Sequence, residues 1–103
     1  MRILGIDPGT GIVGFGCVSF GDGDKREMVG AGVLRFKPEQ PLPERLMQIH
    51  AELTHLISEF KPDAMSVEKL FFAQNVTTAM SVSHARGVIL LCGQQAGLPI
   101  HEY

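Results

Sequence analysis

The sequence predicts an α/β fold in which a mixed five-stranded sheet packs against helices. Three observations support this fold class. Residues 2–36 have the apolar, β-branched and glycine-rich composition of strands, two later segments carry apolar residues at helical spacing, and a short apolar strand follows each of them. An order of three strands, helix, strand, helix and strand is typical of a sheet covered by helices.

Residues 2–36 are expected to form three strands joined by tight turns. Pro8, Gly9 and Gly11 turn the chain after the first strand, and the Gly-Asp-Gly-Asp segment at 21–24 separates the second from the third. Because both connections are short, we expect consecutive strands to be antiparallel neighbours.

The first helix is expected to begin near Pro43 and to end before Pro62. Pro43 suits a first helical turn, and Pro62 cannot continue a helix. Apolar residues recur between them at helical spacing, at Leu42, Leu46, Ile49, Leu53, Leu56, Ile57 and Phe60. We expect three methionines to fill the core, namely Met47, Met65 and Met80.

A short buried strand is expected at residues 63–67 and a second helix from about Val76 to Ala96, followed by a fifth strand at 99–103. This order places Asp7 at the end of the first strand and Glu68 at the end of the fourth. If these two strands are adjacent and parallel, both carboxylates emerge at one edge of the sheet, where ligands bind in such folds.

Two convergent carboxylates predict a Mg²⁺ site. Hard divalent cations take oxygen ligands and combine carboxylates with substrate phosphates, which suits phosphoryl chemistry. The alternatives are a turn aspartate that satisfies its own backbone and a solvated glutamate at a strand end. These alternatives are weaker for the pair, because Glu68 lies between the apolar segments 64–67 and 70–72.

The composition is that of one globular domain, which we expect to span residues 1–103. Apolar residues make up 45% of the chain, charged residues 19%, and the net charge is −2. Neither sign of charge forms a block, so charge alone does not indicate a nucleic-acid binder. Cys17 and Cys92 lack metal-ligand spacing, and no apolar segment approaches the ~20 residues of a membrane span. We therefore expect a soluble cytoplasmic protein with reduced thiols.

Three motifs resemble those of the RuvC-type Holliday junction resolvases. They are Leu4-Gly5-Ile6-Asp7-Pro8-Gly9-Thr10 with Gly14-Phe15-Gly16, Val67-Glu68-Lys69-Leu70-Phe71-Phe72-Ala73-Gln74-Asn75, and Ala85-Arg86-Gly87-Val88. The resemblance covers the whole chain. It implies a ribonuclease H-like fold, a homodimer and Mg²⁺-dependent, symmetric cleavage of four-way DNA junctions, for recombination and repair.

The resemblance also implies a catalytic centre. Asp7 and Glu68 match the family's first two catalytic carboxylates, which would hold two Mg²⁺ ions, or Mn²⁺ in their place, at the scissile phosphate. The products would carry 5′-phosphate and 3′-hydroxyl ends. Members of the family continue past the fifth strand into a segment with basic DNA contacts and the remaining metal ligands.

DNA contacts are expected around the second motif. By its match with the family, Phe71 would stack on an unpaired base at the junction centre, whereas core packing is as good an account of Phe72. Phosphate contacts are expected at Lys69 and Arg86, with a local ion pair as the alternative for Arg86. We also assign Thr10, in the first motif, to DNA binding.

The second helix carries a candidate dimer interface. Ala79, Ser83 and Gly87 are small residues four apart, which lets another helix approach closely. The resemblance implies a two-fold contact along this helix, and packing on the protein's own sheet is the alternative. The family further implies a branch-migration helicase complex as a partner.

We expect the 103-residue chain to be a truncated resolvase with little or no nuclease activity. Two dications ~4 Å apart repel each other by about 17 kcal/mol at an effective dielectric near 20, and two carboxylates compensate four positive charges poorly. A catalytically incomplete junction-binding or dimerisation module is therefore one alternative function. The other is an ATP-binding fragment, because residues 5–10 are similar to the first phosphate loop of actin-like ATPases and sugar kinases; the chain contains no second such loop.

Overall fold

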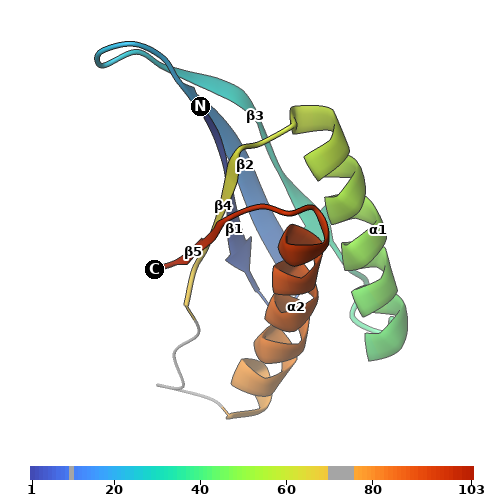
Figure 1. Cartoon of the computed structure of the whole chain (residues 1–103). Coiled ribbons are helices and arrows are strands. Elements are labelled where there is room, and N and C mark those ends of the chain that lie inside the picture. Colours follow the sequence, from blue (N-terminus) through green and yellow to red (C-terminus); the bar gives the residue numbers. More distant parts are fainter. Residues whose placement is uncertain (10, 70–75) are drawn as a thin grey trace.

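The computed structural model describes residues 1–9, 11–69 and 76–103, including all of their side chains except those of residues 76–78. Within these residues, a five-stranded sheet has the strand order β3-β2-β1-β4-β5. Both helices lie on one face of this sheet (Figure 1). The elements are β1 (Arg2–Pro8), β2 (Ile12–Phe20), β3 (Arg26–Arg35), α1 (Leu42–Phe60), β4 (Ala64–Val67), α2 (Val76–Gln95) and β5 (Ile100–Glu102).

The sheet is mixed, and β1 lies at its centre. β1 pairs with β2, and β2 with β3, in antiparallel fashion, which confirms the prediction for residues 2–36. β1 pairs with β4, and β4 with β5, in parallel. The condition for bringing the two carboxylates together is therefore met, because β1, which contains Asp7, and β4, which precedes Glu68, are adjacent and parallel.

Both helices have the limits that the sequence predicted. Pro43 lies in the first turn of α1, and the helix ends at Phe60, followed by Lys61 in a left-handed conformation with φ of 49°. The Lys61 backbone N–H donates to the carbonyl of Ile57 at 2.9 Å and closes the last turn. Gly97, with φ of 73°, lies just beyond α2, where a positive φ suits glycine.

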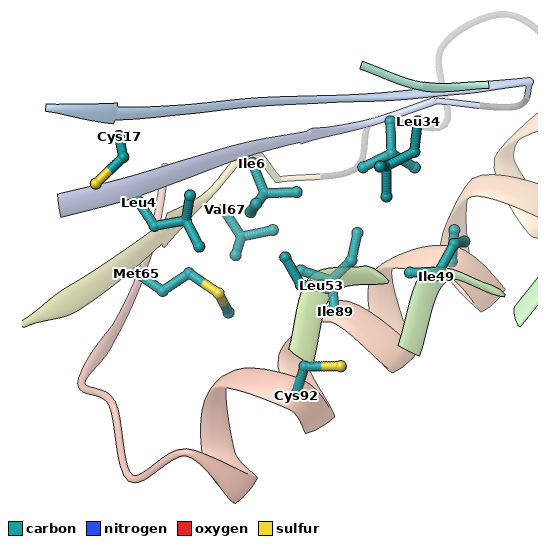
Figure 2. Packing of buried hydrophobic residues seen from close by; sticks show 12 residues of the cluster. Leu4, Ile6, Cys17, Leu34, Ile49, Leu53, Met65, Val67, Ile89 and Cys92 are labelled. Carbon is teal, nitrogen blue, oxygen red and sulfur yellow. The ribbon is translucent and has the colours of Figure 1, made fainter. Parts of the chain in front are cut away.

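The core fills the space between the sheet and the two helices (Figure 2). Leu4 of β1, Met65 of β4 and Ile89 of α2 are fully buried, and Leu53 of α1 is 1% exposed. α2 approaches β4 closely at Gly93, where an added Cβ would collide with the Met65 methyl group and the Ile100 side chain. α2 therefore packs closely against β4 and β5, the strands that lie furthest from β3 in the sheet.

The prediction that three methionines fill the core is confirmed for Met65 and wrong for the other two. Met47 is 70% exposed and Met80 is 56% exposed. Each lies next to a residue that takes the inward position instead: Leu46 packs against the core beside Met47, and Ala79 is buried beside Met80. Adjacent helical positions point about 100° apart, so only one of each pair can face the sheet.

Candidate functional site

The parallel strands β1 and β4 bring Asp7 and Glu68 together at one edge of the sheet. Ile6 pairs with Val67, so the next position on each strand carries one of the two carboxylates. The pairing continues beyond β4, since the Glu68 backbone N–H donates to the carbonyl of Ile6 at 3.2 Å. The backbone thus places the predicted pair side by side.

The side chains of Asp7 and Glu68 interact directly. The Asp7 carboxylate accepts a hydrogen bond from the protonated Glu68 carboxyl. This bond and the negative charge of Asp7 raise the pKa of Glu68, and burial adds a smaller upward contribution. Like charges this close disfavour simultaneous ionisation, so one carboxyl retains its proton more tightly. In the described part of the chain, neither carboxylate forms an ion pair with a basic side chain. The pair is therefore a negatively charged site suited to binding a cation.

The local sequence explains why Asp7 projects from the sheet. Leu4 and Ile6 are 0% and 1% exposed, whereas Asp7 is exposed. Gly14 lies opposite Asp7 on β2, where an added Cβ would be in ordinary van der Waals contact with the Asp7 Cβ at 3.7 Å. At Gly9 an added Cβ would collide with the Ile12 carbonyl oxygen, so the turn after the strand requires glycine.

Arg86 of α2 contacts the same end of β4. Its Nε donates to the backbone carbonyl of Glu68 at 3.1 Å, and its guanidinium forms an ion pair with Glu102 of β5. The local ion pair that we weighed as the alternative for Arg86 is therefore present, and the expected DNA contact of Arg86 stays a prediction. Sequence reasoning missed Glu102, although its place at the end of the last strand put it at the same sheet edge as Glu68.

The other expected DNA contacts are only partly described. Lys69 follows Glu68, its side chain is exposed, and its backbone N–H donates to the Tyr103 carbonyl at 2.6 Å. This bond continues the pairing of β4 with β5 and holds Lys69 beside the carboxylate pair. Thr10, Phe71 and Phe72 lie outside the described residues, so their predicted roles stay predictions.

The predicted dimer face of α2 needs a correction at Ala79. This residue is only 4% exposed, because it faces the protein interior. Ser83 and Gly87 are exposed, and an added Cβ at Gly87 would meet nothing within 4 Å. The accessible surface instead includes the apolar side chains of Met80 and Leu91, which are 56% and 49% exposed. We call Met80, Ser83, Gly87 and Leu91 the outer face of α2.

A complete metal-ligand set is not present among residues 1–9, 11–69 and 76–103, where no three His, Cys, Asp or Glu side chains are grouped closely enough to hold an ion. The carboxylate pair alone offers the oxygen ligands that Mg²⁺ and Mn²⁺ prefer. Cys17 and Cys92 are buried free thiols, and burial raises the pKa of each. The described helices include none with the length and apolar character needed to cross a membrane.

Comparison with known proteins gives one consistent result. The family model described as "Crossover junction endodeoxyribonuclease RuvC" matches residues 3–103. RuvC of Brevibacillus brevis is 50% identical over 103 residues, covering 100% of this chain and 61% of that protein. RuvC of Chloroflexus aurantiacus is 48% identical over 103 residues, covering 100% of this chain and 62% of that protein. The chain thus spans about three fifths of the length of these curated relatives.

A solved structure gives the same result for the fold. Thermus thermophilus RuvC in complex with a Holliday junction substrate superposes with a TM-score of 0.92 at 32% identity, covering 100% of this chain and 65% of that chain. The predicted ribonuclease H-like, mixed five-stranded sheet is confirmed by this match and by the strand order.

Proposed function

The chain belongs to the RuvC crossover junction endodeoxyribonuclease family, and we propose that it supplies Asp7 and Glu68 as catalytic carboxylates for the symmetric nicking of four-way DNA junctions. The single observation that carries this proposal is the parallel pairing of β1 with β4, which places the two carboxylates side by side at the carboxyl ends of these strands. The Thermus relative crystallised with a Holliday junction supports the choice of substrate.

Asp7 and Glu68 would hold the divalent cation, Mg²⁺ or Mn²⁺, and in the complete enzyme we propose two ions at each site. The donor set fits, since both groups are carboxylates and the pairing of β1 with β4 places them side by side. When bound, the ions stabilise the charge of the reacting phosphate and activate water for in-line attack. Glu68 must release the proton that it holds more tightly beside Asp7, so its binding to a cation strengthens as the pH rises. The products would carry 5′-phosphate and 3′-hydroxyl ends.

We propose that Lys69 contacts a DNA phosphate close to the cut. Its exposed side chain follows Glu68 directly, and its backbone is fixed to Tyr103. With a net charge of −2, the chain has no excess of positive charge, so DNA must be held by local contacts. Thr10, Phe71 and Phe72 complete the proposed set, with Phe71 stacking on an unpaired base.

Two symmetric nicks require two sites related by a two-fold axis, so we propose a homodimer that associates through the outer face of α2. Exposed Met80 and Leu91 supply apolar area, while Ser83 and Gly87 let a second helix approach closely. A branch-migration helicase complex is the proposed further partner, and the cytoplasm is the proposed location.

We further propose that residues 1–103, which span about three fifths of the length of the curated relatives, form one nuclease domain that cleaves little by itself. Two carboxylates offset the charge of two divalent cations only in part. Cation binding and junction binding need fewer groups than catalysis does, so the isolated chain would bind a junction more readily than it cuts one.

The test measures binding and nicking of a labelled four-way junction by the purified chain in Mg²⁺, with a linear duplex of the same sequence as competitor. We expect preferential junction binding and slow or undetectable nicking. Any nicking should be lost in Asp7→Asn and Glu68→Gln and kept in Asp24→Asn, a matched control on the exposed turn between β2 and β3. Equal affinity for duplex and junction, or specific binding of ATP instead, would contradict the proposal.

A further inference from the structure

We propose that Arg86 is a positioning residue that fixes Glu68 for cation binding, and that Glu102 holds Arg86 in place. This inference rests on the proposed function of the Asp7 and Glu68 pair and names the groups that set its geometry. It differs from the DNA contact expected from the sequence, because the positions of the Arg86 side-chain atoms point to a role inside the protein.

The backbone of Glu68 is held from two sides. Its N–H donates to the Ile6 carbonyl of β1 at 3.2 Å, and its own carbonyl accepts a hydrogen bond from Arg86 Nε at 3.1 Å. Glu68 lies one residue beyond the end of β4. At this position strand pairing still accounts for the backbone N–H but no longer for the carbonyl. With both groups bonded, the residue keeps one backbone orientation, and its carboxylate stays next to Asp7.

The Arg86 guanidinium is held between two elements. One of its N–H groups contacts the strand end at Glu68, and another pairs with Glu102 of β5. The Arg86 side chain is 16% exposed, compared with 45% for Glu102. Arginine presents several N–H donors in one rigid plane, so a single side chain can satisfy a carbonyl and a carboxylate in different directions. Lysine has no equivalent of this planar arrangement.

Strand pairing keeps Glu102 in reach of Arg86. Glu102 lies opposite Val67, and the Tyr103 N–H donates to the Val67 carbonyl at 3.1 Å. Because the Arg86 guanidinium already forms an ion pair with Glu102, the Glu102 carboxylate largely compensates the positive charge of Arg86. The Glu68 carboxylate is therefore left to Asp7 and to a cation, which a direct Arg–Glu68 pair would oppose.

The experiment measures Mn²⁺ affinity and amide hydrogen exchange in the purified chain, comparing Arg86→Gln, Arg86→Lys and Glu102→Gln. We expect both Arg86 variants to weaken Mn²⁺ binding roughly 10- to 100-fold, the range found when groups that orient metal ligands are lost. Glu102→Gln should cause a smaller loss. Exchange of the Glu68 amide should accelerate in the Arg86 variants, while amides of the β1–β2 pair keep their protection. Arg26→Gln, an exposed charge at the first residue of β3, is the matched control.

Each outcome separates the possible roles of Arg86. If Arg86→Gln binds Mn²⁺ with unchanged affinity but loses affinity for a four-way junction, Arg86 is a DNA contact and the positioning role is wrong. Full rescue by Arg86→Lys would also overturn it, because only charge would then matter. Should Asp7→Asn and Glu68→Gln leave Mn²⁺ binding unchanged, the proposed cation site fails, while Glu68 amide exchange still tests the Arg86 contact.

Discussion

Asp7 and Glu68 lie side by side at the carboxyl ends of the parallel strands β1 and β4, close enough for Asp7 to affect the titration of Glu68. This contact joins a residue of the first strand to one that follows the fourth, and it depends on the crossover through α1. The arrangement raises the pKa of Glu68 above its ordinary value of 4.5. Several measurable properties of the protein follow from it.

Replacing Asp7 with asparagine should lower the pKa of Glu68 toward its ordinary value. The substitution removes the neighbouring negative charge and provides an N–H donor that favours the ionised form of Glu68. A pH titration of ¹³C-labelled glutamate carboxyl groups by NMR measures this change. Asp24→Asn should leave the Glu68 titration as it is in the unaltered chain, and an unchanged pKa in Asp7→Asn would show that the two groups do not interact in solution.

The same pair should make stability depend on pH. The folded state holds the Glu68 proton more tightly than the unfolded state does, so the free energy of unfolding should decrease as the pH rises from about 4.5 through the raised pKa. Asp7→Asn should flatten this decrease. Urea unfolding between about pH 4 and pH 7 provides the comparison, and equal slopes for both proteins in that window would argue against an effect of Asp7 on the pKa of Glu68.

Substitutions on the two sides of α2 should differ strongly in their effect on stability. Ile89 is fully buried against the sheet, so Ile89→Ala should cost about 2–5 kcal/mol of unfolding free energy. Leu91 is 49% exposed, so Leu91→Ala should change stability by less than about 1 kcal/mol. Chemical denaturation at a concentration low enough to keep the chain monomeric separates these values. Similar losses at both positions would contradict the observed orientation of α2.

The two glycines inside α2 should respond in opposite directions to alanine. At Gly87 a Cβ meets open space, so Gly87→Ala should stabilise the chain by up to about 1 kcal/mol through helix propensity. At Gly93 a Cβ collides with Met65 and Ile100, so Gly93→Ala should cost about 1–3 kcal/mol. Thermal unfolding of the two variants reports the difference, and a stabilising Gly93→Ala would mean that α2 and β4 are further apart than described.

Self-association should respond to charge on the outer face of α2. Leu91→Lys places a positive charge within the proposed two-fold contact and removes apolar area from it. Sedimentation equilibrium should show a dimer for the unaltered chain and a monomer for this variant. As a control, Met28→Lys alters an exposed apolar residue on β3 and should leave the association intact.

Local signals in the sequence predicted most of the fold. Pro43, Pro62 and Gly97 mark helix limits through backbone chemistry that is independent of tertiary contacts, and the apolar spacing of α1 gives its buried side. Strand order is a property of the whole chain, so the sequence predicted a site at one sheet edge only on the condition that β1 and β4 were parallel neighbours.

The errors came from orientations that only packing decides. Ala79 was expected on a dimer face and Met80 in the core, yet the rotation of α2 about its axis exchanges their environments. The ion-pair partner of Arg86 could not be predicted from the sequence for the same reason, since Glu102 comes within reach of Arg86 only when α2 packs beside β5. The spacing of residues along a helix shows which side chains share a face. Tertiary contacts decide which face meets the core.

We propose that Asp7 and Glu68 form one divalent-cation site, and a Mn²⁺ titration followed by paramagnetic broadening in NMR spectra would locate the bound ion. Broadening should begin at the amides of Asp7 and Glu68 and should be lost in both Asp7→Asn and Glu68→Gln, with Asp24→Asn behaving as the unaltered chain. Broadening centred on other residues, or retained in both variants, would show that Asp7 and Glu68 do not form the cation site.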